Sequence, residues 1–151
     1  MRIVVQRVSN ASVSFHGKEK SKIGKGFLVL LGIETEDDSS DADYLVKKLL
    51  NLRIFSDDEG KMNLSVLDVH GEILIVSQFT LHAATKKGNR PSYIRAARPE
   101  QAIPLYHYFI DELQKDFEIP IQTGEFGADM QVSLVNDGPV TILLDSKSKD
   151  Y

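Results

Sequence analysis

Cysteine is absent from the 151-residue chain, which excludes disulfides, thiolate zinc sites and a cysteine nucleophile. Long hydrophobic runs are absent too: the longest, residues 27–31, falls far short of the roughly 20 apolar residues that a membrane-spanning helix needs. Arg7 interrupts the region where a signal peptide would need its apolar stretch. We therefore expect a cytoplasmic domain without a membrane segment.

Motifs of the common catalytic sites are missing as well. The four histidines show no metal-ligand spacing, and neither H-E-x-x-H, G-x-S-x-G nor a phosphate-binding glycine loop occurs. The net charge of −4 disfavours a general nucleic-acid binder. Residues 34–43 hold six acidic side chains and no basic one, whereas residues 85–98 hold five basic side chains and no acidic one. A charge run is usually a solvated face, but the basic one is where contact with phosphate is expected.

What is present indicates an ordinary globular protein, since 42% of the residues are hydrophobic and 26% are charged. Alternating or continuous apolar residues predict strands at residues 3–8, 12–15, 27–33, 72–79, 130–135 and 140–144, with another short strand ending before residue 24. The run at 27–33 is apolar throughout, so we expect a central strand covered on both faces. A turn at residues 136–139 separates the last two strands, because Asp-Gly permits positive φ.

Two amphipathic helices are predicted by apolar residues that recur at spacings of three and four. Ser39 and Ser40 are the expected cap of the first helix, which carries Ala42, Leu45, Leu49 and Leu52 on one face. The second is expected over residues 99–117, where Pro104 should kink the helix or delay its start. The predicted fold class is therefore α+β: one domain over residues 1–145, with a mixed, mostly antiparallel sheet, two helices and a frayed tail at 146–151.

Two segments at strand ends carry the only unusual residues. In SQFTL, residues 77–81, an apolar strand ends in polar side chains, and NDGPVT, residues 136–141, reads locally as a turn. Taken separately, each is explained by a strand end or a turn that satisfies its own backbone. Composition and spacing alone leave a soluble α+β domain of unknown purpose.

Together, these two segments resemble the signature motifs of the D-aminoacyl-tRNA deacylases. The resemblance covers nearly the whole chain, because MRIVVQRVSNASVSF, LNLRIFSDDEGKMN, KKGNRPSY and FGADMQVSLVNDGPVT also fall in the family's order and spacing. Departures are minor: Tyr93 stands where the family often has Phe, and Pro104 interrupts the second helix.

The resemblance implies hydrolysis of the ester that joins a D-amino acid, or mischarged glycine, to the terminal ribose of tRNA, a proofreading step in translation. It also implies a homodimer without a metal or cofactor. A cis Gly138-Pro139 peptide would project into the partner subunit's pocket, where its carbonyls exclude the side chain of an L-amino acid. Arg7 resembles the family position that holds this loop. Gly138 suits the role because a backbone without Cβ can approach a ligand closely.

The implied catalytic residues are those of the first motif: Ser77, Gln78, Phe79 and Thr80. Backbone N–H groups around Phe79 and Thr80 would stabilise the oxyanion. No histidine or carboxylate in the motif activates the Thr80 hydroxyl, so we expect assistance from the 2′-OH of the substrate ribose. Positions that resemble the lining of the pocket for the adenosine and the aminoacyl group are Ser77, Gln78, Phe126 and Met130.

Binding of tRNA phosphates is expected from Lys86, Lys87 and Arg90 in the basic stretch. Two alternatives stay open. One is a relaxed relative that accepts some L-aminoacyl-tRNA, and the other is a non-catalytic RNA-binding module with the same fold.

Overall fold

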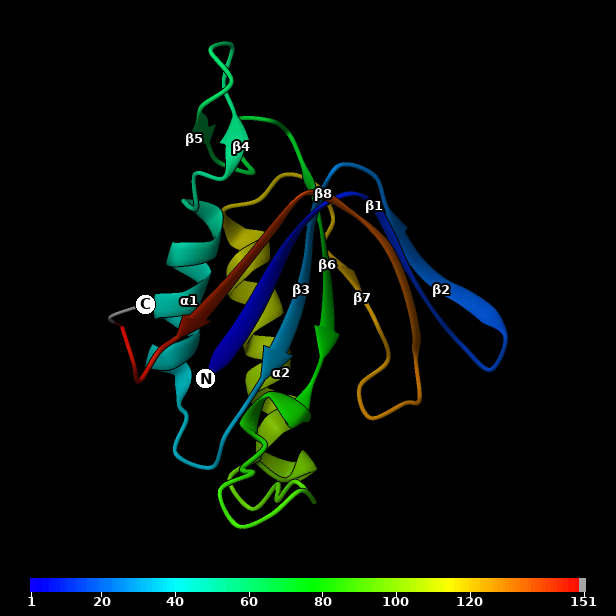
Figure 1. The fold of residues 1–151 in the computed structure, drawn as a ribbon, viewed down its shortest axis with the longest axis vertical. Coiled ribbons are helices and arrows are strands. Elements are labelled where there is room, and N and C mark those ends of the chain that lie inside the picture. The colour runs from blue at the N-terminus through cyan, green and yellow to red at the C-terminus, as the bar shows by residue number, and fades with distance from the viewer. Residues whose placement is uncertain (150–151) are drawn as a thin grey trace.

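A six-stranded mixed sheet, with two helices against one face, makes up most of the fold in a computed structural model that describes residues 1–149 (Figure 1). The sheet contains β1 (Arg2–Phe15), β2 (Lys18–Ile23), β3 (Gly26–Gly32), β6 (Glu72–Ser77), β7 (Gln122–Thr123) and β8 (Gln131–Asp145). The helices are α1 (Ser39–Leu50), α2 (Pro99–Lys115) and the short 3-10 helix η1 (Phe79–His82). A separate hairpin pairs β4 (Phe55–Ser56) with β5 (Met62–Leu64). The predicted α+β class is confirmed.

The strand β1 organises the sheet, whose order is β2-β1-β3-β6-β7 with β8 also on β1. Along one edge β1 pairs first with β3 and then with β2, and along its other edge it pairs with β8, in each case antiparallel. The pairs β3–β6 and β6–β7 are parallel. Parallel neighbours require crossovers, and α1 and α2 are the helices of these two connections, which run in the same direction across the sheet. Both helices therefore cover the same face.

The main core lies between that face and the helices, where Phe27 and Ile73 pack with Leu45 and Phe109. The opposite face also buries side chains, because the sheet curls until the Ser21 hydroxyl on β2 donates to the Thr123 carbonyl on β7 at 2.7 Å. This second cluster comprises Val8, Ala11, Val13, Ile23, Leu28, Leu74 and Val76. As expected, β3 is therefore covered on both faces.

Two pairs of predicted strands are each one continuous strand, which corrects the sequence interpretation. Residues 3–8 and 12–15 both belong to β1, and residues 130–135 and 140–144 fall almost wholly within β8. The turn expected at 136–139 is instead an irregularity in the ladder, because Gln6 pairs with Thr141 and Val8 with Asn136, so that residues 137–140 stand opposite Arg7 alone. An edge strand tolerates this bulge and its proline, since no partner needs the missing N–H.

Helix ends differ from the predictions at both termini: α1 ends at Leu50, before Leu52, and α2 ends at Lys115, two residues before 117. The cap of α1 is Asp38, not Ser39 or Ser40: its carboxylate accepts the Ser40 N–H at 2.8 Å, and the Asp41 carboxylate accepts the Asp38 N–H at 3.0 Å. Pro104 does not delay the start of α2, which begins at Pro99. The helix continues through Pro104, although proline has no backbone N–H to donate within the helix.

The remaining strand and tail boundaries also shift. The strand predicted over 72–79 ends at Ser77, where the chain turns toward η1. In the tail expected to fray, the Ser146 N–H donates to the Met1 carbonyl at 2.9 Å and the Lys147 ammonium to the Asp41 carboxylate at 2.8 Å. Residues 150–151 lie outside the described part of the chain. None of the helices found in residues 1–149 is long and apolar enough to cross a membrane.

Candidate active site

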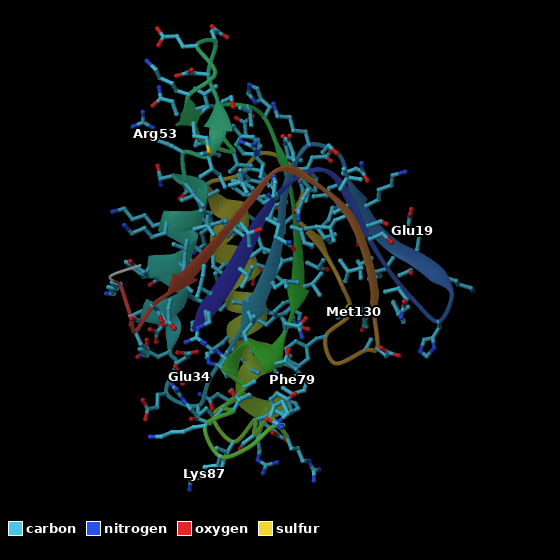
Figure 2. All side chains as sticks on the ribbon, viewed as in Figure 1. Glu19, Glu34, Arg53, Phe79, Lys87 and Met130 are labelled. Atoms are coloured by element: carbon cyan, nitrogen blue, oxygen red, sulfur yellow. The ribbon has the colours of Figure 1, made fainter. Side chains whose placement is uncertain are left out.

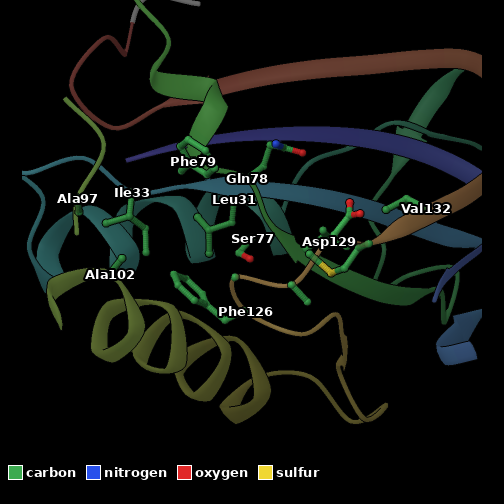
Figure 3. Close-up of a pocket in the computed structure, with 14 residues that line it drawn as sticks. Leu31, Ile33, Ser77, Gln78, Phe79, Ala97, Ala102, Phe126, Asp129 and Val132 are labelled. Atoms are coloured by element: carbon green, nitrogen blue, oxygen red, sulfur yellow. The ribbon is translucent and has the colours of Figure 1, made fainter. Parts of the chain in front are cut away.

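A cavity of about 270 Å³ opens where the parallel strands β3 and β6 end (Figure 3). Ligand sites in parallel sheets characteristically lie beyond the carboxyl ends of the strands. Five side chains predicted from the sequence line this cavity: Ser77, Gln78, Phe79, Phe126 and Met130. The fold thus brings the first motif together with residues about fifty positions further along the chain.

One residue of η1, Phe79, lines the cavity, and η1 packs tightly against the end of β3. A Cβ on Gly32 would lie 3.0 Å from both the Gln78 carbonyl oxygen and the Leu81 Cβ, so glycine is needed for this close approach. Among residues 1–149, the Phe79 and Thr80 N–H groups at the head of η1 donate to no carbonyl or side chain. These two donors are available to a ligand.

Thr80 itself does not line the cavity. Its Oγ1 accepts a hydrogen bond from Gln78 Nε2 at 2.6 Å. An amide N–H is a donor and cannot remove the hydroxyl proton, so this contact positions Thr80 without activating it as a nucleophile.

Aromatic packing holds the far wall of the cavity. Phe126 meets Tyr106 edge to face at 5.4 Å between ring centroids, and the Tyr106 hydroxyl donates to the Ile75 carbonyl at 3.3 Å. Burial, with a smaller contribution from Glu125, raises the pKa of Tyr106 well above its usual range. Tyr106 therefore keeps its proton, and with it this hydrogen bond, even at alkaline pH where an ordinary tyrosine would ionise.

Ionisable groups are scarce around the cavity. Asp129 is the one acidic or basic side chain among the described residues that line it, and it is exposed. No three His, Asp or Glu side chains in the part of the chain that the structure describes are gathered so as to hold a metal ion. The described residues that line the cavity thus offer a backbone donor at Phe79 and an apolar wall, and none of them is a buried general base.

The second motif lies elsewhere in the chain. Gly138 and Pro139 are exposed, do not line the cavity and are joined by a cis peptide bond. Buried Arg7 holds the segment from below: its Nε donates to the Asp137 carbonyl at 2.9 Å and its Nη1 to the Ile54 carbonyl at 2.5 Å. Gly138 has a φ of +132°, and a Cβ there would lie 2.8 Å from Val140 Cγ2.

The predicted phosphate ligands lie in a loop beyond η1. We call residues 85–91 the basic loop; it contains Lys86, Lys87 and Arg90, all exposed, and is closed by paired Ala84 and Ser92. Figure 2 shows Lys87 and Phe79 at the same end of the molecule. These cations are not among the residues that line the cavity.

Comparisons with known proteins decide the family. The family model described as D-Tyr-tRNA(Tyr) deacylase matches residues 4–145. The chain is 61% identical over 150 residues to the D-aminoacyl-tRNA deacylase of Bacteroides thetaiotaomicron, covering 99% of this chain and 100% of that one. It is 60% identical over 147 residues to the deacylase of Thermosipho melanesiensis, covering 97% and 98%. The chain belongs to the D-aminoacyl-tRNA deacylase family. Deacylation hydrolyses an ester, so this deacylase is an ester hydrolase, as the sequence predicted.

Two solved structures resemble this deacylase. The c-Myc DNA Unwinding Element Binding Protein superposes with a TM-score of 0.92 at 48% identity, covering 96% of this chain and 98% of that one. A probable eukaryotic D-amino acid tRNA deacylase superposes with a TM-score of 0.80 at 18% identity, covering 95% and 98%, which shows the shared fold alone.

Some residues at the site of the deacylase were missed by sequence reasoning. Ala97 and Ala102 line the cavity, but small apolar residues near a helix start carry no signal that separates them from core positions. Asp129 also lines the cavity, and no sequence pattern marked it as a site residue. Tyr93, whose ring meets Phe79 edge to face at 5.0 Å, offered one, since it is an aromatic residue within a basic stretch.

Proposed function

We propose that the chain hydrolyses the ester of D-aminoacyl-tRNA and of mischarged glycyl-tRNA in the cavity beside η1, and that it rejects L-aminoacyl-tRNA. The observation that carries this proposal is that the N–H groups of Phe79 and Thr80 donate to nothing within residues 1–149. Phe79 lines the cavity together with Ser77 and Gln78, and Thr80 follows Phe79 directly. An ester carbonyl seated there develops negative charge as water attacks, and two preorganised backbone donors stabilise that charge.

Water activation is assigned to the substrate. Asp129 is exposed, and Thr80 is bonded to an amide rather than to a base. The terminal ribose carries a 2′-OH beside the ester, which can position the water and share its proton without any shifted pKa in the protein. The protein then contributes orientation and the oxyanion donors.

Chiral selection is assigned to the Gly138-Pro139 peptide of a second copy of the chain. Within one chain this peptide is exposed and away from the cavity, yet Arg7 holds it firmly. Within residues 1–149, the strand that carries it, β8, pairs with β1 alone. Val135 and Leu143 on β8 are 53% and 39% exposed. A two-fold dimer that covers β8 would insert each Gly138-Pro139 into the other cavity, where its carbonyls occupy the side of the α-carbon that an L side chain needs.

The test is a comparison of D-aminoacyl-, L-aminoacyl- and glycyl-tRNA at equal concentration, with the oligomeric state measured by light scattering at the same protein concentration. We expect release of D-amino acid and glycine, retention of the L-ester, and a dimer. Turnover of the L-ester at a similar rate would indicate the relaxed relative. Binding of charged tRNA without any hydrolysis would indicate a nucleic-acid-binding module. An active monomer would overturn the shared-pocket mechanism.

A further inference from the structure

Two exposed aromatic rings lie beside the mouth of the cavity. Phe79 is 55% exposed and Tyr93 38%, and the neighbouring Ile94 is 85% exposed. The Phe79 and Tyr93 rings meet edge to face, with centroids 5.0 Å apart and planes at 74°. Phe79 lines the cavity and Tyr93 does not, so the pair extends from the cavity outward. Large apolar side chains gathered on a surface mark binding sites.

Tyr93 is presented by a fixed segment. Just before it, Ala84 and Ser92 exchange two backbone hydrogen bonds of 2.8 and 2.9 Å. Just after it, the Arg95 guanidinium donates from Nε and Nη2 to the buried Glu34 carboxylate at 3.0 and 2.5 Å. A ring that is held in place before binding loses little conformational entropy when a ligand stacks on it.

Positive charge adjoins the rings. Tyr93 follows directly on the hydrogen-bonded pair that closes the basic loop, so Lys86, Lys87 and Arg90 project from the loop that Tyr93 borders. No acidic residue occurs between residues 85 and 98. Exposed aromatic rings next to cations are the combination that binds single-stranded nucleic acid, since bases stack while the cations pair with phosphates.

We infer that Phe79 and Tyr93 form a stacking platform for the unpaired nucleotides that precede the terminal adenosine of tRNA. The inference rests on the proposed function, which seats the ester at the Phe79 and Thr80 N–H groups. From there the nucleotide chain leaves the cavity over Phe79, passes Tyr93 and reaches the basic loop. The platform contacts bases through their faces, so it fits every tRNA whatever its acceptor-stem sequence.

The experiment compares Tyr93→Ala with Tyr93→Phe on two substrates. One is D-aminoacyl-tRNA, and the other is D-aminoacyl-adenosine, which has the ester but no preceding nucleotide. We expect Tyr93→Ala to raise KM for the tRNA about tenfold, within the range for loss of one stacked base, while kcat holds and KM for the adenosine ester shifts less than about twofold. Tyr93→Phe keeps the ring and restores KM. Tyr44→Ala, which removes an aromatic ring on α1, serves as the matched control.

Affinity for an RNA hairpin that ends in CCA and carries no amino acid, measured by fluorescence anisotropy, gives the same comparison of variants without turnover. We expect weaker binding by Tyr93→Ala alone. Equal KM changes on both ester substrates, or unchanged hairpin affinity, would overturn the platform. Failure of the unaltered protein to hydrolyse D-aminoacyl-tRNA would instead overturn the proposed function, whatever the hairpin affinities of the variants.

Discussion

The two motifs, at residues 77–81 and 136–141, are built in opposite ways. The first ends a buried central strand, and Ser77, Gln78 and Phe79 face the cavity of their own chain. The second bulges from the edge strand β8, with residues 136–139 all exposed. The first motif therefore lines a cavity within its own chain, whereas the second motif lies exposed on the surface. In the function proposed above, a site that needs both motifs is divided between two copies of the chain.

Both motifs nevertheless depend on backbone rather than on reactive side chains. Gly32 lets η1, whose Phe79 lines the cavity, pack against β3, and Arg7 fixes the carbonyl of Asp137. An aminoacyl ester is already activated, so oriented donors and a positioned water suffice for its hydrolysis. The proposed mechanism therefore needs no motif built around an activated nucleophile.

Removing the 2′-OH of the substrate tests the first motif most severely. We expect tRNA that ends in 2′-deoxyadenosine, charged at its 3′-OH with a D-amino acid, to react about 100-fold more slowly or worse, the contribution of a general acid–base group. Single-turnover rates of the unaltered protein on the two substrates measure this loss. The control is that both substrates bind with similar affinity. Normal turnover of the deoxy substrate would assign water activation to the protein.

Gly138→Ala tests the second motif. The new Cβ would meet Val140 and Arg7 at a φ of +132°, so the segment must shift. We expect the ratio of kcat/KM for D- over L-aminoacyl-tRNA to fall at least about tenfold, as loss of a steric contact of about 1–3 kcal/mol predicts. Gly60→Ala is the matched control, because Gly60 also has a positive φ, +78°, and a Cβ added there would meet nothing within 4 Å. An unchanged ratio in folded Gly138→Ala would place selectivity elsewhere.

The sequence alone predicts the first region better than the second. Apolar runs identified β3 and β6, whose neighbours on both faces are hydrophobic. Residues 136–139 misled the prediction, because Asp-Gly-Pro is typical of turns and only pairing with β1 makes it a bulge in one strand. The cavity wall at Ala97 and the contact of Tyr93 with Phe79 arise from tertiary packing, which no local pattern encodes.

Thr80→Ala asks whether the first motif acts through a side chain. The Thr80 hydroxyl accepts from Gln78 and lacks a base, so we expect kcat to fall about tenfold or less, on the order of 1.4 kcal/mol. Thr80→Ser keeps the hydroxyl and should retain the rate. Single-turnover assays with an acid quench measure both variants. A collapse of the rate together with a trapped acyl-enzyme would make Thr80 the nucleophile.

The smallest effect concerns how the far end of β8 is anchored. The two residues that follow β8, Ser146 and Lys147, donate hydrogen bonds to the Asp41 carboxylate on α1. Burial of this carboxyl acts to raise its pKa, but the hydrogen bonds outweigh burial, and the pKa of Asp41 is lowered to about 2. Asp145, at the end of β8, also has a lowered pKa: burial opposes the shift, and hydrogen bonds from Arg2 and the Lys147 N–H outweigh burial. A carboxyl whose folded pKa lies below its unfolded value of about 4 adds stability above that pH. That stability is lost as the pH falls toward about 2.

Lys147→Ala should therefore lower the free energy of unfolding at neutral pH by about 1 kcal/mol or less, since the ammonium is partly exposed. The difference from the unaltered chain should shrink between about pH 4 and pH 2, because protonation of Asp41 removes from the unaltered chain the ion pair that the variant already lacks. Urea unfolding at several pH values measures it, with Lys61→Ala, which breaks the exposed pair with Glu59, as the control. A difference that persists undiminished at low pH would show that Lys147 stabilises the end of β8 through packing and not through charge.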